Sequence, residues 1–307
     1  MAEITAQGVK ALRDQTGAGM MDCKNALSAT EGDMEAAVDW LRAKGLAKAA
    51  KKASRVAAEG LVGVVVDGRA GALVEVNSET DFVARNEMFQ TLVRDIGRVA
   101  PAAEGDVERL KAMAYPGLDK SIGEHVTDMI GKVGENMVVR RTAWLAVKEG
   151  VVASYVHNQV APGLGRIGVL VSLESAGKAP VLAEFGRQLA MHVAAANPVA
   201  LDLSGVPLEV IEREKAILAE KNQGKPAHVI EKIMESGLKS FAKENCLLDQ
   251  TFVIDPTQSV AQAIQQTAGR AGAPIALSGF VRFRLGEGVE KEEEDFAAEV
   301  ARTAAGG

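Results

Sequence analysis

The sequence has little of what disulfide-linked and zinc-binding proteins need. Its 307 residues include only two cysteines, and Cys23 and Cys246 lie far apart without metal-ligand spacing. This arrangement suggests neither a disulfide nor a zinc site, and we expect both thiols to be buried.

Catalytic motifs are also missing. The sequence contains no HExxH, GxxxxGK(S/T) or GxSxG pattern. Its one GxGxxG match, at 163–168, runs into a predicted strand and not into the helix that a phosphate-binding loop requires. The histidines are scattered along the chain, at positions His125, His157, His192 and His228. We therefore expect a protein that is not an enzyme and that needs no cofactor or metal.

Long hydrophobic runs do not occur. No stretch approaches the length of a membrane span, and the N-terminus lacks the basic and then apolar pattern of a signal peptide. We expect no membrane association, and the cytoplasm is the simplest location.

The chain has no excess of positive charge. Its 35 basic residues oppose 41 acidic ones, and the net charge of −6 argues against broad, direct binding of nucleic acid. The exception is an alanine-rich segment with five basic residues and no acid: Lys44, Lys48, Lys51, Lys52 and Arg55. This segment predicts a positively charged helix, which is either a solvated face or a contact for an acidic protein surface.

Helical spacing dominates the first 45 residues. The length of the chain allows one large domain or two to three small ones, and its 47% apolar content is ordinary for a globular protein. Three short helices are predicted here, separated by glycines, and Gly45 is expected to end the third. Met20 and Met21 lie at a corner between helices, where they suit either core packing or an adaptable interface.

Strand and helix patterns then follow twice in a similar order. The first set has strands at 63–66 and 72–76, a helix at 83–99, a helix at 122–133 ended by Gly134, and a strand at 137–147. The second set has strands at 151–156 and 167–173, a helix at 180–196, and a strand at 276–285. The repeated order of strand, strand, helix and later strand predicts two related α+β subdomains.

An insertion interrupts the second set. Apolar residues at helical spacing lie on both sides of a helix stop and restart at 222–226, which predicts an antiparallel helical hairpin. The hairpin is either a packed part of the core or a protruding arm for self-association. At the C-terminal end, 290–295 is strongly acidic, and Phe296 and Val300 suggest one short amphipathic helix.

The most informative position is Phe82, an aromatic residue in the polar turn between a strand and a helix. Thr80 or Asp81 is a plausible N-cap for that helix. Phe82 is then either a hydrophobic staple packed against Phe89 or an exposed anchor offered to a partner.

The segment 77–85, above all Thr80-Asp81-Phe82-Val83, closely resembles the signature of the elongation factor Ts family, the exchange factors for elongation factor Tu. Segments 16–24 and 44–60 resemble the first two motifs of that family, in the same order. The resemblance continues through 131–141, 154–157, 166–171, 190–198 and 279–298, so it covers nearly the whole chain.

The resemblance implies an α+β multidomain fold with small antiparallel sheets. It has a ubiquitin-associated-like three-helix bundle at 1–54 and a core N-subdomain at 55–148. A core C-subdomain, formed by 149–206 and 247–286, carries the coiled-coil hairpin at 207–246. A C-terminal module at 287–307 then supplies a helix that docks on the partner.

It also implies a binding role. Elongation factor Tu, GDP-bound or nucleotide-free, is the implied partner, and a homodimer through the hairpin is a further implied contact. The residues implied to dislocate the magnesium ion of the partner are Thr80, Asp81, Phe82 and Val83. The other implied contacts are Arg13, Met20, Met21, Val133, Gly134 and His157. After His157, Asn158 and Gln159 replace the glycine-rich continuation that the family pattern leads us to expect.

Two other functions are compatible with parts of the sequence. A ubiquitin-like or ribosome-associated adaptor would use the N-terminal bundle and the basic helix, but it leaves Phe82 and the hairpin unexplained. A small-molecule transferase would need a site that the sequence does not contain.

Overall fold

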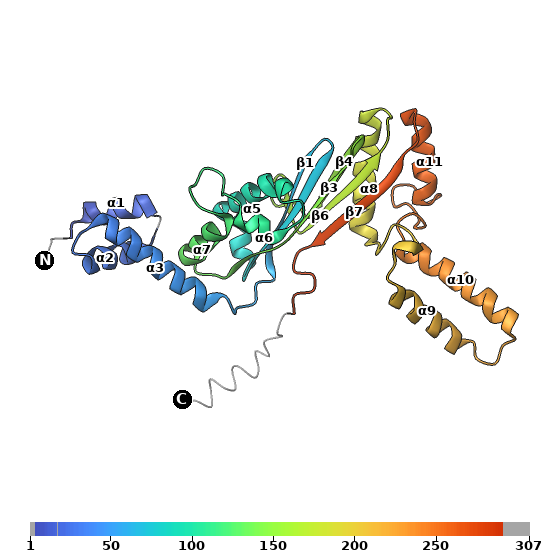
Figure 1. Ribbon diagram of the computed structural model, residues 1–307, viewed down its shortest axis with the longest axis horizontal. Helices are drawn as coiled ribbons and strands as arrows, with labels where there is room; N and C mark the ends of the chain where they lie inside the picture. The colour runs from blue at the N-terminus through green and yellow to red at the C-terminus, as the bar shows by residue number, and fades with distance from the viewer. Residues whose placement is uncertain (1–3, 17, 291–307) are drawn as a thin grey trace.

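The computed structural model describes residues 4–16 and 18–290. The protein is a mixed α/β molecule of elongated shape, with helices at its N-terminal end and a helical hairpin at the opposite end (Figure 1). Two small antiparallel sheets lie between them, which confirms the predicted class of fold.

The N-terminal helices are α1 (Ala6–Thr16), α2 (Met20–Ala29) and α3 (Met34–Lys52). Their small core contains Leu12, Cys23 and Leu27, so the first cysteine is buried as expected. The prediction that Gly45 ends the third helix is wrong, because α3 continues to Lys52.

Close packing explains why α3 continues through Gly45. A Cβ added at Gly131 of α7 (Ile122–Val133) would lie 3.1 Å from the Gly45 Cα. The two glycines thus let the helices cross closely. Glycine is less favourable than alanine inside a helix by about 1 kcal/mol, and this packing outweighs that cost.

The first sheet has the strand order β3-β2-β1-β5, with all neighbours antiparallel. Its strands are β1 (Glu59–Asp67), β2 (Ala70–Ser78), β3 (Met137–Ala146) and β5 (Leu164–Gly165). β1 and β2 are longer than predicted and are joined by a two-residue turn, in which Gly68 has a φ of 56°.

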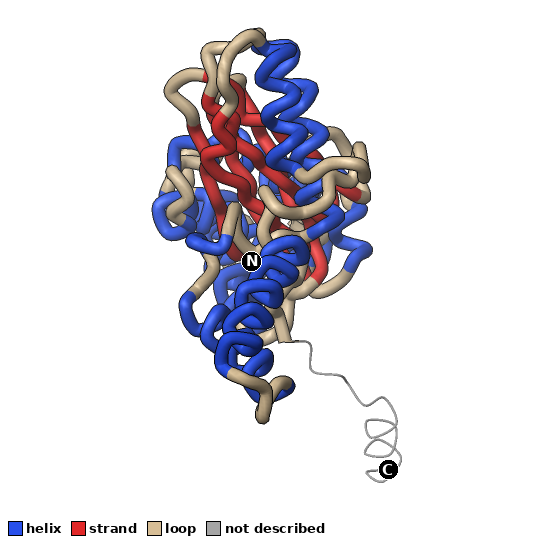
Figure 2. Tube along the Cα trace, turned by 90° about the vertical axis from the view of Figure 1, so that its right-hand side faces the viewer, coloured by secondary structure: helices blue, strands red, loops and turns tan. Residues whose placement is uncertain are grey.

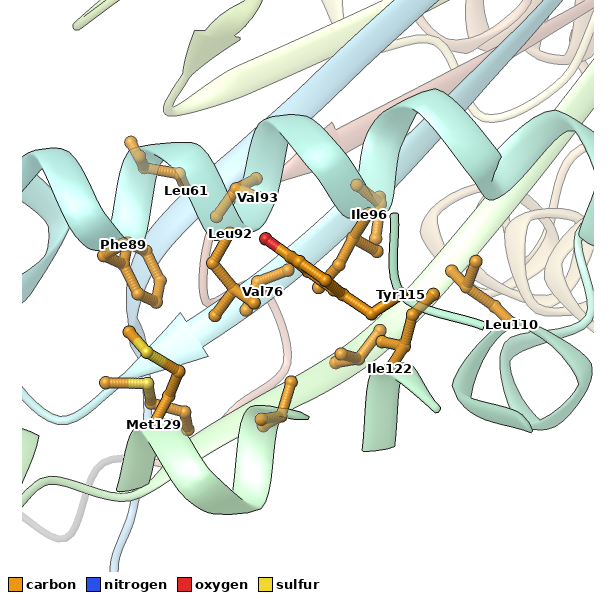
Figure 3. Packing of buried hydrophobic residues seen from close by; sticks show 14 of the residues in the cluster. Leu61, Val76, Phe89, Leu92, Val93, Ile96, Leu110, Tyr115, Ile122 and Met129 are labelled. Atoms are coloured by element: carbon orange, nitrogen blue, oxygen red, sulfur yellow. The ribbon is translucent and has the colours of Figure 1, made fainter. Parts of the chain in front are cut away.

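Helices pack on this sheet around a core of buried apolar side chains (Figure 3). They are α4 (Asp81–Arg85), α5 (Glu87–Val99), the 3-10 turn η1 (Ala100–Ala103), α6 (Val107–Ala112) and α7. The single helix predicted at 83–99 is in fact two helices. Asn86 has extended backbone angles and its side chain accepts a hydrogen bond from the Met88 N–H (2.8 Å), so it caps α5 and separates it from α4.

The second sheet has the order β4-β6-β7. It contains β4 (Gly150–His157), β6 (Ile167–Glu174) and β7 (Ala276–Arg284), and α8 (Ala179–Ala196) packs on it. The sheet order matches that of β1, β2 and β3, since the second strand of each set is central. Side chains from both sheets, including Val62, Leu73, Val152 and Leu170, form one shared cluster. Figure 2 shows the strands with helices beside them.

The helices α6 and α11 (Val260–Ala271) were not predicted from the sequence. Ser259 accepts from the Gln262 N–H, and the Gln262 side chain accepts from the Ser259 N–H. This capping box is a signal for the start of α11 that could have been found in the sequence.

The insertion contains the short turn η2 (Leu203–Gly205) and then α9 (Leu208–Lys221) and α10 (Ala227–Asn245), which pair as a protruding hairpin (Figure 1). α9 has no buried residue and α10 has only Ala242. The alternative that the hairpin is a packed part of the core is therefore wrong. Self-association through the hairpin stays a prediction.

Two further expectations concern the membrane and the C-terminus. Among the described residues, no helix is both long and apolar enough to cross a membrane. The amphipathic helix expected around Phe296 and Val300 lies outside the described residues, as does the acidic run after Glu290.

His192 of α8 offers a test of this packing. It is fully buried; its Nε2–H donates to the Gln250 Oε1 (2.9 Å) and its Nδ1 accepts from the Val253 N–H (3.2 Å). Burial lowers the pKa of His192 below its ordinary value of 6.5. Below pH 6.5 the unfolded chain therefore binds more protons than the native one, so this group makes stability fall as the pH falls. We expect an NMR titration of the His192 ring to have its midpoint below 6.5; a midpoint at or above 6.5 would contradict this account.

Candidate partner-binding site

Phe82 is strongly exposed. Its side chain is 77% exposed, more than any other large apolar side chain in the described ranges. The next two residues of α4, Val83 and Ala84, are each 7% exposed and belong to the core cluster that also contains Phe89. The staple interpretation is therefore wrong, because Phe82 points away from the core that its neighbours join.

Hydrogen bonds hold the turn before Phe82. Glu135 accepts from the Thr80 N–H at 3.0 Å and from the Thr80 hydroxyl at 2.7 Å. Glu79 accepts from the Asn136 N–H at 2.5 Å. Thr80 is the N-cap of α4, which is one of the two predicted alternatives, but its side chain makes no capping bond to the helix. Its hydroxyl instead fixes the turn to the segment after α7.

Asp81 lies at the start of α4, where it pairs with Arg85 one turn later (2.6 Å). The Asp81 side chain is 40% exposed and that of Arg85 72% exposed. An exposed pair of this kind adds little to stability, about 0.3–0.5 kcal/mol. Asp81 can therefore exchange its partner for a group on another protein at low cost.

Glu135→Ala should loosen this turn without unfolding the protein. Losing two hydrogen bonds to a charged acceptor weakens the local structure by about 1.5–3 kcal/mol, or at least about tenfold in the local opening equilibrium. Hydrogen–deuterium exchange of the amides at 80–84 should accelerate by that factor. Glu87→Ala, an exposed acid on α5, is the matched control. Unchanged protection at 80–84 in Glu135→Ala would refute the bracing role.

The end of α7 lies beside this turn. Val133 is half-buried against the same core, and Gly134 ends the helix with a φ of 87°. The carbonyl of Gly134 accepts a hydrogen bond from the Lys52 ammonium of α3. Since Glu135 follows Gly134 directly and binds Thr80, the structure brings Val133 and Gly134 together with the segment from Thr80 to Val83.

His157 lies exposed at the end of β4, directly after the strand predicted at 151–156. Asn158 has a φ of 51°, a conformation that asparagine tolerates better than most residues, which explains how it can replace a glycine there. Arg166, beside this tip, pairs with Glu59 (3.1 Å), and Glu59 pairs in register with Ser78. The tip therefore lies at the same end of the sheets as Thr80.

The other predicted residues lie on the N-terminal bundle. Met20 and Met21 are 60% and 65% exposed on α2, and Arg13 is exposed on α1. No hydrogen bond, ion pair or shared apolar cluster in the described residues joins them to Phe82. The structure thus divides the predicted residues between two regions.

Sequence reasoning missed the supports of this site, which are Glu135, Lys52 and Arg166. The only sequence signal for Glu135 is its place directly after the helix-ending Gly134. In the part of the chain that the structure describes, no group of three or more metal-ligand side chains could hold an ion. The arrangement offers an exposed aromatic, an acid and backbone groups, which suit contact with another protein.

Comparison with known proteins agrees with the sequence motifs. The family model described as elongation factor TS matches residues 79–287. Proteins named elongation factor Ts from Methylobacterium sp. (strain 4-46) and Parvibaculum lavamentivorans are 60% and 59% identical, over 100% of this chain and of each relative. The protein of that name from Xanthobacter autotrophicus is 61% identical over 99% of both chains. Full-length identity of this degree, together with the match over most of the chain, means that the chain belongs to the elongation factor Ts family of translation elongation factors.

Proposed function

We propose that this protein binds elongation factor Tu and promotes release of its GDP without catalysing a covalent step. The observation that carries this proposal is Phe82, which is exposed on a short helix whose neighbouring residues are anchored in the core. A rigidly presented aromatic is typical of the residues that dominate binding energy at protein interfaces. The proposed role places the protein in the cytoplasm.

In the proposed mechanism Phe82 inserts between two helices of the partner. Asp81 and the adjacent backbone contact the segment that Phe82 displaces, and the magnesium ligands of the partner lose their alignment. The bracing of Thr80 by Glu135 supports this role, because a mobile turn would yield instead of deforming the partner.

Linkage then explains the exchange cycle. If this protein weakens GDP binding by some factor, GDP must weaken the binding of this protein by the same factor. A transient complex of elongation factor Tu, GDP and this protein can therefore release either the GDP or this protein. GTP then occupies the emptied site and the two proteins separate.

Release of labelled GDP from elongation factor Tu tests the proposal. Micromolar amounts of this protein should accelerate the release, and the acceleration should saturate as the complex forms. No acceleration would refute exchange activity. If the Phe82→Ala variant accelerated the release as much as the unaltered protein, the insertion mechanism would be refuted, but the proposed exchange activity would stand.

Met20→Ala should weaken complex formation more than it slows the exchange step. Met20 is exposed on α2, away from the turn that carries Phe82, so it can add binding energy without deforming the nucleotide site. We expect the concentration for half-maximal exchange to rise about three- to tenfold, as for a contact worth about 1 kcal/mol, with the maximal rate kept. Leu208→Ala, 73% exposed on the distant hairpin, is the control. A lower maximal rate at unchanged half-saturation would contradict this division of roles.

A further inference from the structure

A cleft of about 740 Å³ separates the N-terminal bundle from α7, and it meets the partner-binding site described above only at Lys52 and Gly134. We call it the basic cleft; its cationic lining residues are Arg42, Lys44, Lys48, Lys52, Lys120 and Lys132. Among the described residues, Asp22 and Asp128 are the only carboxylates that line it. A concentration of positive charge in a chain of net charge −6 favours an acidic occupant.

The ion pairs inside the basic cleft leave positive charge in excess. Asp22 is shared by Lys44 (2.9 Å) and Lys48 (2.8 Å), so one carboxylate faces two ammonium groups. The pKa of Asp22 is lowered by its hydrogen bonds to Lys48 and Lys44, which keeps that carboxylate charged. Lys120 pairs with Asp128 (2.5 Å) and Arg42 with Glu124 (3.8 Å), whereas Lys52 binds only the neutral carbonyl of Gly134 among the described contacts.

The basic cleft also has an apolar side. Val38 and Leu41 of α3 are half-buried there, and Leu118 is 42% exposed. An occupant that combines several carboxylates with one large apolar side chain would match both halves. Such a sequence exists at the C-terminal end of this chain, where Glu292, Glu293, Glu294 and Asp295 precede Phe296.

The chain is long enough to reach the Lys52 end of the basic cleft. A Cβ added at Gly286 would lie 2.5 Å from the carbonyl oxygen of Ala58, so the start of the C-terminal segment is fixed beside Ala58. Lys52 in the cleft is six residues before Ala58, at most about 20 Å away along the chain. The six to ten residues from Gly286 to 292–296 span up to about 20–35 Å when extended.

We propose that the acidic segment 292–296 docks in the basic cleft, with its carboxylates on the lysines of α3 and α7 and Phe296 against Val38, Leu41 and Leu118. The docked segment links the N-terminal bundle to the core. It would thereby fix the position of Met20 and Met21 relative to Phe82. This contact is within one chain, so it does not depend on the proposed exchange activity.

NMR spectra of the full chain and of a variant that ends at Glu290 test the docking. We expect amide shifts at 44–52 and 131–134 to differ between the two, and about 1 M NaCl, with a screening length of about 3 Å, to remove the difference. A synthetic peptide of residues 286–300 added to the shortened chain should restore the shifts of the full chain. Differences confined to other parts of the chain, or none, would overturn the proposal.

Two variants show whether charge recognition is the cause. A peptide with Glu292→Gln, Glu293→Gln and Glu294→Gln should lose at least about tenfold in affinity, and Lys132→Gln in the shortened chain should weaken the normal peptide about two- to fivefold. Lys239→Gln on α10 is the matched control and should change nothing. Equal binding of the two peptides would refute recognition of the acidic segment, even if the peptide binds.

Discussion

Phe82→Ala is expected to abolish most of the exchange activity and leave the fold intact. The side chain is 77% exposed, so its removal takes almost nothing from the core, and the free energy of unfolding should change by less than about 0.5 kcal/mol. A central aromatic at an interface contributes about 2 kcal/mol or more, which corresponds to about 30-fold or more in the efficiency of GDP release.

The maximal rate distinguishes a residue that deforms the partner from one that only holds it. If Phe82 acts by insertion, the variant should release GDP slowly even when it saturates elongation factor Tu, because the interaction is made in the activated state of exchange. A variant with a normal maximal rate and a raised half-saturation concentration would show that Phe82 only contributes affinity.

Phe89→Ala is the matched control for this experiment. Phe89 is 1% exposed in the core beneath α4, and removing a buried phenylalanine destabilises a protein by about 3–5 kcal/mol. Its thermal midpoint should therefore fall strongly while that of Phe82→Ala stays unchanged. If both midpoints fell together, Phe82 would have a structural role that its exposure does not indicate.

The sequence was a good guide where a segment is long and has a clear end signal. The helices predicted at 122–133 and 180–196 both appear, and the residues that follow them, Gly134 and Asn197, adopt the left-handed conformation that stops a helix. Periodicity over three or more turns records which face is buried. The strands were predicted from their valine-rich centres. Their ends extend further, because the hydrogen bonds between strands do not require apolar side chains.

Contacts between distant segments account for the failures. Gly45 continues in a helix because Gly131, 86 positions later, packs against it. The exposure of Phe82 could not be predicted because α4 has only five residues, too few to show a periodic face. The orientation of α4 is set instead by Val83 and Ala84 in the core and by Glu135, which is 55 residues from Thr80.

Glu75→Ala should cause the largest loss of stability. Glu75 is fully buried in β2 and accepts hydrogen bonds from Arg140 (3.0 Å), Arg141 (2.6 Å), Asn77 (3.1 Å) and the Gly286 N–H (2.9 Å). Among the described residues, removal of this acid leaves Arg140 without a carboxylate partner and leaves Arg141 only the longer pair with Glu287 (3.7 Å). Loss of one partner of a buried ion pair destabilises a protein by about 3–5 kcal/mol. The thermal midpoint, measured by calorimetry or circular dichroism, should fall on the order of 10 °C.

The position of Glu75 predicts where the structure loosens first. The carboxylate joins β2 of the first sheet to Gly286, just after β7 of the second, and Arg141 also donates to the Arg284 carbonyl (2.9 Å). In Glu75→Ala, amides at 284–287 should therefore exchange faster than those of α8, which does not contact the cluster. The thermal midpoint of Glu75→Gln should lie between those of the unaltered protein and Glu75→Ala. The glutamine amide oxygen can still accept one hydrogen bond but carries no charge for the arginines. Glu235→Ala, from an exposed pair on α10, should leave the midpoint within about 1 °C. If Glu75→Ala matched that control, the buried carboxylate would not join the two sheets.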